Sequence, residues 1–165
     1  MKATSDLFTV RSSTNNGTAK VFECYFADQN DKRIEDFHQI DSWSWLKYHY
    51  PHIPACHVTN ESDVPVQYRN KLKQKGLVSG VSDLMIMTPS HKGLYLYASI
   101  ELKRSTKTLS SPVSNEQHEW LMRCAENGGF SCVCYGVKSF RAAMTWYLTG
   151  VLPNGYSDSS VIIRN

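Results

Sequence analysis

The chain has 165 residues, of which 41% are hydrophobic and 20% are charged, and its formal net charge is +3. These values are ordinary for one globular domain with a hydrophobic core. No stretch approaches the roughly 18 apolar residues of a membrane-spanning helix, and the N-terminus lacks the apolar segment of a signal peptide. The sequence therefore argues against a membrane protein and a secreted protein, and we expect an intracellular location.

Five cysteines are present, which is an odd number. Without a secretory signal, reduced thiols are the expected state. Cys132 and Cys134 are close in sequence, but a structural zinc site usually needs two such pairs of ligands. We interpret the cysteines as structural residues of the core.

The first 20 residues are rich in Ser, Thr and Asn and show little apolar periodicity, which is typical of a flexible N-terminal arm. Residues 21–26 (VFECYF) predict a short edge strand. We place the main domain at residues 21–150. Residues 151–165 are polar and contain Gly and Pro, and we interpret them as a C-terminal tail or a late edge strand.

Residues 32–50 predict a helix that ends before Pro51. Its apolar side chains at near-helical spacing are expected to face the core, and they are Ile34, Phe37, Ile40 and Trp45. Glu35 and Gln39 are four residues apart and share one face. On spacing alone, Glu35 is either a site residue or a surface glutamate of an amphipathic helix.

Residues 52–60 read as an extended segment with two histidines, His52 and His57, whose side chains titrate near neutral pH. No nucleophile and acid stand in a recognisable arrangement with them, so we assign neither histidine to catalysis. A short basic helix, closed by Gly76, is expected at residues 66–74.

Two strands are predicted at residues 80–87 (GVSDLMIM) and 94–104 (LYLYASIELKR), joined by a turn that contains Pro89 and Gly93. The second strand alternates so that Glu101 and Lys103 project from the same face. If the strands pair, Asp83 lies beside Glu101. Two neighbouring carboxylates repel each other unless a cation lies between them, and oxygen ligands suit Mg²⁺ or Mn²⁺. The alternative is a solvated strand end with a surface ion pair.

Basic residues flank these acids on both sides. We predict that they contact the phosphates of DNA, although a solvated lysine-rich surface is the alternative. The predicted DNA-binding residues are Arg69, Lys71, Lys73, Lys75, Arg104 and Lys107.

After a loop at residues 106–113, Ser114 and Gln117 form an S-x-x-Q capping box that begins a helix, which ends at Gly128 and Gly129. Residues 130–135 (FSCVCY) predict a strand, and Ser139 is expected to cap a last helix. The strand, helix, strand order implies a right-handed parallel crossover. The sequence therefore predicts an α/β sandwich.

The ordered pieces GVSDLMIM, SIELKR, LSSPVSNEQHEWLMRCAENGG and FSCVCYGVKSFRAAMTWYL resemble the VRR-NUC family of the PD-(D/E)XK nuclease superfamily, over residues 34–148. The resemblance implies a restriction-endonuclease-like core, a mixed β-sheet flanked by helices in the order αβββαβ. One departure is Ser82, where the family usually has proline.

The resemblance also implies the roles of individual residues. Asp83, Glu101 and Glu35 are expected to hold Mg²⁺, with Mn²⁺ as a substitute, and Lys103 and Gln117 complete the catalytic set. Gln117 lies near the metal in that family, while plain helix capping is the alternative. The expected function is a Mg²⁺-dependent, structure-specific DNA endonuclease, similar to a Holliday-junction resolvase, that acts as a homodimer on branched DNA.

Two other functions remain open from the sequence. One is a nuclease-fold module that binds DNA without cleaving it. The other is a nuclease of different specificity, such as a restriction enzyme or an exonuclease. The presence of Asp83, Glu101 and Lys103 together favours an enzyme over a binding module, because binding alone does not need three charged groups at one site.

Overall fold

A computed structural model describes residues 19–26, 28, 30–59, 65–154 and 161–164. Nearly all of the predicted N-terminal arm lies outside these residues. A six-stranded sheet forms the centre of the described part. Its strands are β1 (Val21–Tyr25), β2 (Ala55–His57), β3 (Leu84–Ile86), β4 (Tyr97–Lys103), β5 (Gly129–Tyr135) and β6 (Val161–Arg164).

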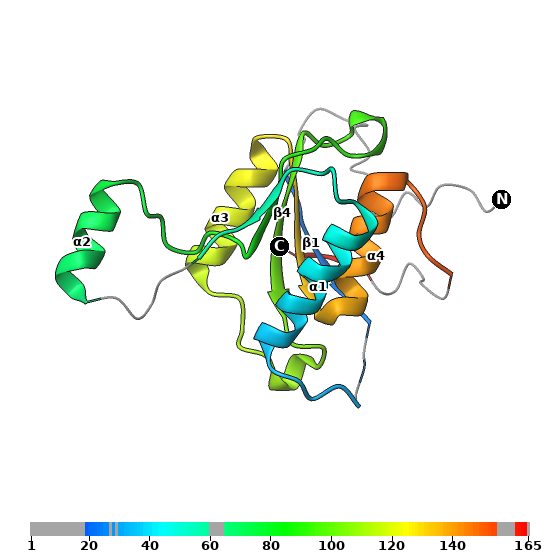
Figure 1. The fold of residues 1–165 in the computed structure, drawn as a ribbon, viewed down its shortest axis with the longest axis horizontal. Coiled ribbons are helices and arrows are strands. Elements are labelled where there is room, and N and C mark those ends of the chain that lie inside the picture. Colours follow the sequence, from blue (N-terminus) through cyan, green and yellow to red (C-terminus); the bar gives the residue numbers. More distant parts are fainter. Residues whose placement is uncertain (1–18, 27, 29, 60–64, 155–160, 165) are drawn as a thin grey trace.

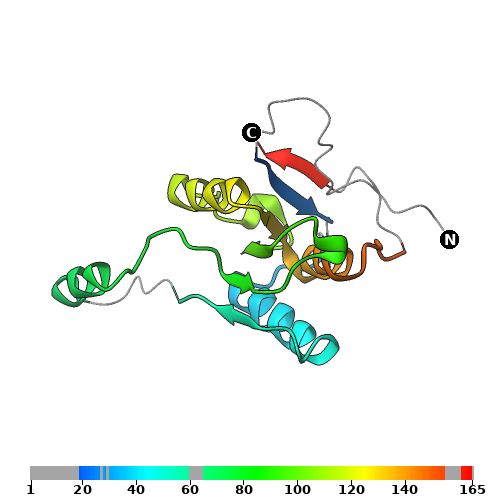
Figure 2. The same ribbon diagram turned by 90° about the horizontal axis from the view of Figure 1, so that it is seen from above.

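Helices cover both faces of this sheet, as Figures 1 and 2 show. The helices are α1 (Glu35–His49), α2 (Val66–Gln74), α3 (Asn115–Glu126) and α4 (Gly136–Thr149), with the short 3₁₀ turns η2 (His91–Gly93) and η3 (Lys107–Leu109). Helix α3 packs on one face, and α1 and α4 pack on the other. Helix α2 projects away from the body of the fold. No helix among the described residues is long and apolar enough to cross a membrane.

The strand order is β2-β3-β4-β5-β1-β6. Strands β4, β5 and β1 run parallel, and the other neighbours pair antiparallel. The predicted parallel crossover is therefore confirmed, because α3 connects β4 to its parallel neighbour β5. The α/β class and the αβββαβ order are also confirmed, with α2 inserted between β2 and β3.

Two hydrophobic clusters lie on the two faces of the sheet. The larger one joins the sheet to α1 and α4 and includes Leu102, Phe130 and Tyr147. The smaller one lies under α3 and includes Leu121 and Val133. Both faces are thus covered, so the polar face predicted for β4 is not open to water. Four of the five cysteines are buried free thiols, as predicted, whereas Cys56 is exposed.

The predicted core face of α1 is wrong for three of its four residues, whereas Trp45 packs against the larger cluster as predicted. Ile34, Phe37 and Ile40 are 52%, 54% and 59% exposed, whereas His38, Ser42 and Leu46 are buried. The helix packs on α4 and β4 through this second row of side chains, each one turn after the last. The spacing of the apolar residues was helical, but partners far away in the sequence decide which row is buried.

The predicted strands of the hairpin are longer than the observed ones. Strand β3 is only Leu84–Ile86, and β4 begins at Tyr97. Leu94 and Leu96 are 50% and 63% exposed, because the chain passes through η2 before β4 begins. Only the second half of the alternating segment pairs as a strand.

Two predictions at the ends of the domain also need correction. Strand β1 is not an edge, because β6 pairs with its outer side, so the last segment contains the late edge strand. Ser139 does not cap α4, because the helix already begins at Gly136. Its hydroxyl donates to the Tyr135 carbonyl and accepts from the Phe26 N–H instead, which ties α4 to the end of β1.

The burial pattern of α1 gives a testable prediction. Leu46→Ala should lower the free energy of unfolding by about 2–5 kcal/mol, because the side chain is fully buried in the larger cluster. Tyr48→Ala, on the same helix but 82% exposed, should change it by less than about 0.5 kcal/mol. Urea unfolding followed by circular dichroism measures both. Equal effects of the two variants would contradict the observed packing of α1.

Candidate active site

Asp83 and Glu101 lie next to each other at one end of the sheet, as predicted. Strands β3 and β4 pair with Leu84 opposite Ile100, so Asp83 is opposite Glu101 one step beyond the last pair. The Asp83 Oδ2 accepts a hydrogen bond of 2.7 Å from the Leu102 backbone N–H. This bond fixes the Asp83 carboxylate against the strand that carries Glu101.

Glu101 and Lys103 form a buried ion pair. Only 1% of Glu101 and 2% of Lys103 is exposed, and Lys103 Nζ lies 3.1 Å from Glu101 Oε1. Lys103 Nζ also lies 4.0 Å from Glu35 Oε1, at the start of α1. The alternative of a solvated surface ion pair is therefore wrong. A pair withdrawn from water in this way has a desolvation cost that exposed pairs do not have.

Gln117 both caps its helix and contacts Glu101. The capping box with Ser114 is confirmed: the Ser114 N–H donates to Gln117 Oε1, and the Gln117 N–H donates to Ser114 Oγ. The Gln117 amide nitrogen then donates to Glu101 Oε1. The Gln117 side chain therefore both caps α3 and contacts Glu101, because its oxygen and nitrogen face different partners.

Burial and the repulsion between like charges raise the pKa values of the carboxyl groups at this site. Burial, together with the nearby Asp83 carboxylate, raises the pKa of Glu101 to about 8 against the opposing effect of Lys103. Burial also raises the pKa of Asp83, which the hydrogen bond from Leu102 partly offsets. The pKa of Glu35 is raised for the same reason, with Lys103 opposing it. The positive charge of Lys103 is therefore not enough to offset the burial of the surrounding carboxylates and the repulsion between them.

A hydroxyl network supports the segment that precedes Asp83. The Trp120 indole N–H donates to Ser99 Oγ, and the Ser99 hydroxyl donates to Ser82 Oγ, both within the protein. Serine in place of the proline usual in the resembled family thus provides a hydrogen-bond acceptor that joins this segment to β4 and α3. Gly80, at φ +78°, packs against the backbone of Glu116, where a Cβ atom would clash.

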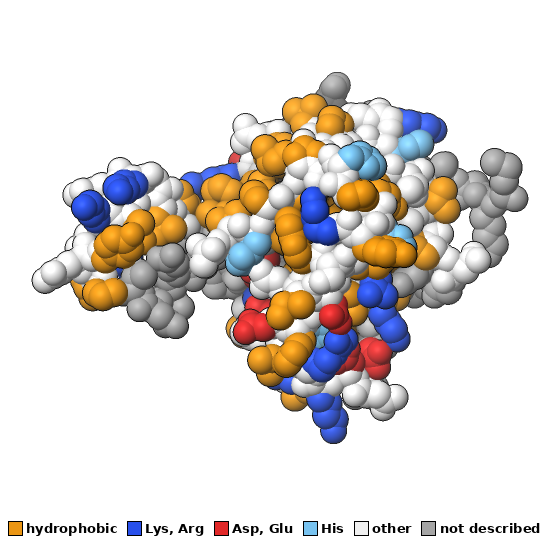
Figure 3. All heavy atoms as spheres, viewed as in Figure 1, with side chains coloured by type: hydrophobic (Ala, Val, Ile, Leu, Met, Phe, Trp, Pro, Cys, Tyr) orange, Lys and Arg blue, Asp and Glu red, His pale blue; other side chains and the backbone are white. Residues whose placement is uncertain are grey.

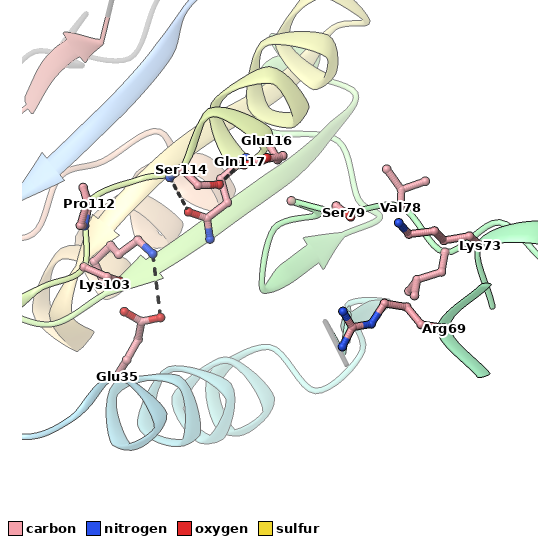
Figure 4. Close-up of a pocket in the computed structure, with 13 residues that line it drawn as sticks. Glu35, Arg69, Lys73, Val78, Ser79, Lys103, Pro112, Ser114, Glu116 and Gln117 are labelled. Carbon is pink, nitrogen blue, oxygen red and sulfur yellow. Dashed lines mark hydrogen bonds and ion pairs between the residues drawn. The ribbon is translucent and has the colours of Figure 1, made fainter. Parts of the chain in front are cut away.

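A pocket of about 520 Å³ opens beside these groups. Figure 4 shows Glu35, Lys103 and Gln117 on one side of it. Arg69 and Lys73 of α2 approach from the other side, and Val78 and Ser79 lie between the two groups. The pocket is therefore lined both by Lys103 of the buried ion pair and by two of the predicted DNA-binding residues.

Gln39, which shares one face of α1 with Glu35, contacts the His57 ring. The other predicted DNA-binding residues do not line the pocket. Lys71 and Lys75 are exposed on α2 and do not line the pocket. Arg104 donates to the Lys32 carbonyl.

Lys107 forms an ion pair with the buried Glu23, 2.9 Å away, and lies over the rings of Tyr25 and Tyr135. Neither Glu23, on β1, nor Lys107 is among the residues that line the pocket. A contact of Lys107 with DNA stays a prediction.

Sequence reasoning missed the position of His57. Its Nδ1 lies 2.8 Å from the Asp83 carbonyl oxygen, a geometry in which the protonated nitrogen donates to that oxygen. The contact arises because β2 pairs with β3, with His57 opposite Leu84. No spacing in the sequence signals this pairing, because the strands are separated by α2.

Asp83 and Glu101 provide some of the oxygen ligands that a divalent cation requires. Glu101 Oε2 is buried without a hydrogen-bond partner, and the Asp83 carboxylate is close enough to raise the pKa of Glu101. Among the described residues, no three His, Cys, Asp or Glu side chains converge in a metal-binding arrangement, so Glu35 stays a predicted ligand only. Mg²⁺ is commonly held by one or two carboxylates, with water and substrate phosphates completing its shell. Asp83 and Glu101 fit that pattern, whereas a closed cage of protein ligands is not formed.

Comparisons with known proteins agree with this architecture. A solved structure titled "VRR_NUC domain protein" matches with a TM-score of 0.57 and 21% sequence identity, over 76% of this chain and 96% of that chain. At this identity the likeness shows the fold alone. No curated protein matches the chain. The family model described as "VRR-NUC domain" matches residues 35–138, which is more than half of the chain and includes all five predicted catalytic residues. The chain therefore belongs to the VRR-NUC family of nuclease-type domains.

Proposed function

We propose that this protein is a Mg²⁺-dependent DNA endonuclease that hydrolyses phosphodiester bonds in branched DNA, similar to a Holliday-junction resolvase. The observation that carries the proposal is the buried pair of Glu101 and Lys103 beside the half-buried Asp83, in which Glu101 Oε2 has no hydrogen-bond partner. Burying charged groups destabilises a fold unless they are compensated, so such a cluster favours a catalytic role. The protein would act inside the cell, where its DNA substrate lies.

Asp83 and Glu101 are the residues that would hold the cation. When bound, Mg²⁺ or Mn²⁺ would lower the pKa of a coordinated water and neutralise charge that develops on the phosphate. Ionised Glu101 is needed for this role, and its hydrogen bond from Gln117 holds the carboxylate in one orientation. Glu35, which contacts Lys103, is the third proposed ligand.

The cationic group of the site is Lys103. Its ammonium is held between Glu101 and Glu35 and lines the pocket. From that position it can donate a hydrogen bond to the attacking water or to a phosphate oxygen. Hydrolysis requires the water oxygen to bond to phosphorus while the bond to the leaving oxygen breaks and that oxygen gains a proton. Lys103 would orient the attacking water, and the hydrogen bond from Gln117 would hold Glu101 in place during the attack.

A homodimer completes the proposal. Two sites related by a twofold axis would nick two strands of a junction symmetrically. Ile34, Phe37 and Ile40 are exposed side by side on the outer face of α1, which lies in front in Figures 1 and 3. Exposed apolar side chains grouped in this way are typical of protein interfaces. They support a contact between copies close to the Glu35 end of the site.

Two other functions are compatible with the same fold. A DNA-binding module without catalysis would keep the basic helix α2 but would not need the buried acids. A nuclease of other specificity, of the restriction type or an exonuclease, would keep the acids and act on linear DNA. The pocket lining offers no group dedicated to one base, so the choice of branched DNA rests on the resemblance to the family.

A cleavage assay separates these functions. With Mg²⁺ or Mn²⁺ we expect paired nicks in a labelled four-way junction and little cleavage of a matched linear duplex. Ca²⁺ should not substitute, because it tolerates loose geometry and activates water poorly. Full activity in excess EDTA would exclude the metal role. Equal cleavage of junction and duplex would favour another nuclease specificity, and binding without cleavage would favour the binding module.

Neutral variants of the acids should separate cleavage from folding. Asp83→Asn and Glu101→Gln keep the shape of each side chain, so each should abolish cleavage and leave DNA binding equal or tighter, because a negative group facing the phosphate is lost. Lys103→Ala should also abolish cleavage but weaken binding slightly. Without metal and above pH 8, where Glu101 is ionised in the folded protein, both acid variants should melt several degrees higher than the unchanged protein, since one of two repelling charges is removed.

The matched control is Glu119→Gln, which removes an exposed carboxylate from α3. It should not change cleavage, binding or melting. If either acid variant keeps its cleavage activity, the catalytic centre lies elsewhere. If either acid variant unfolds, the charge has a structural role.

The raised pKa of Glu101 predicts a pH dependence. The folded protein holds a proton on Glu101 up to about pH 8, whereas the unfolded chain loses it near pH 4.5. Metal-free stability should therefore fall as pH rises through this window, and Glu101→Gln should flatten the decline. Cleavage at limiting Mg²⁺ should rise toward pH 8, because only the ionised carboxylate binds the cation. Melting curves and rates between pH 5 and 9 measure both, and a stability that increases with pH in this window would contradict the assignment.

A further inference from the structure

Helix α2 has no buried face in the described part of the fold. None of its nine residues is buried, and it stands away from the sheet in both ribbon views. A helix of this length is marginal in water by itself, because most helical stability in proteins comes from packing an apolar face. The role of α2 therefore has to be sought in what it contacts outside the fold.

One face of α2 points into the pocket of the active site. Arg69 and Lys73 are one helical turn apart, and both line the pocket together with Lys103 and Gln117. Lys71 follows Arg69 by two residues, which is about 200° around the helix axis, and it does not line the pocket. The four basic residues of this segment thus divide into a pair that faces the site and a pair that does not.

The lining of the pocket is suited to a phosphate backbone. None of the described residues that line it is aromatic, so it offers no platform on which a base would stack. Lys103 is paired with Glu101, and Glu35 and Glu116 add negative charge on the side away from α2. On the α2 side of the pocket the charged lining residues are the cations Arg69 and Lys73. A pocket of about 520 Å³ has room for a short segment of one strand.

We infer that Arg69 and Lys73 bind adjacent phosphates of one DNA strand, on one side of the bond that is cleaved, without reading its bases. The inference rests on the proposed function, because it places the strand between α2 and the buried acids. One turn of helix separates the two side chains by about 6 Å along the axis, similar to the separation of successive phosphates on a strand. Contacts of this kind position a strand but do not specify sequence.

Binding measurements on the full chain without metal test the first part. In the double variant Arg69→Gln, Lys73→Gln the slope of log affinity against log salt should decrease by about 2, because two phosphate contacts are lost. The double variant Lys71→Gln, Lys75→Gln removes the same charge from the same segment and should decrease the slope by less than 1. Equal changes in the two double variants would overturn the inference, since general attraction would then explain both.

Neutral methylphosphonate linkages, placed one at a time in the DNA, test the position. In the unchanged protein, we expect affinity to fall about tenfold at two adjacent linkages on one side of the cleaved bond. The Arg69→Gln, Lys73→Gln variant should show no further loss at these linkages, whereas the Lys71→Gln, Lys75→Gln variant should keep it. If all three proteins lose affinity at the same linkages to the same extent, the inference about Arg69 and Lys73 is overturned and the proposed function still stands. If the unchanged protein binds no DNA, the proposed function fails with it.

Discussion

The buried contact between Lys103 and Glu101 is the constraint on which the site depends. One buried ammonium faces three carboxylates, of which that of Glu101 is buried and those of Asp83 and Glu35 are half-buried. The Gln117 amide and the Leu102 N–H stabilise individual carboxylate oxygens, yet the acids keep raised pKa values. The metal-free protein therefore relieves the excess by holding protons. A divalent cation would replace those protons, so folding, proton binding and metal binding are linked at one point of the chain.

This arrangement requires contacts between segments that are distant in the sequence. The pairing of β3 with β4 sets Asp83 beside Glu101, and a slip of one residue would turn Glu101 to the opposite face. Helix α3 brings Gln117 over the same strand, and the first turn of α1 brings Glu35 to its end. Hydrogen bonds join Ser82 to Ser99 and Ser99 to Trp120. They connect the segment before β3 with β4 and α3, and so help to fix the shape of the site.

What the sequence predicted correctly depends on neighbours along the chain. The bounds of α2, the capping box of α3 and the pairing of Asp83 with Glu101 all follow from local spacing and turns. The buried face of α1, the inner position of β1 and the contact of His57 with Asp83 were missed or wrong. Each of these depends on a partner far away in the sequence, such as α4 for α1 or β6 for β1. A single sequence carries no periodic signal for such pairings.

The distribution of charge explains why the acids and the basic helix need each other. A net charge of +3 is too small to attract DNA strongly over long distances, so attraction has to be local. Near the catalytic acids the attraction of DNA is opposed, because Glu101 and Glu35 offset the charge of Lys103. Glu23 on β1 likewise offsets the charge of Lys107. Cations that face the pocket without crowding the acids come from α2, which the fold holds at a distance. Separating the groups that attract phosphate from those that hold the metal lets the site bind a polyanion and still keep its carboxylates together.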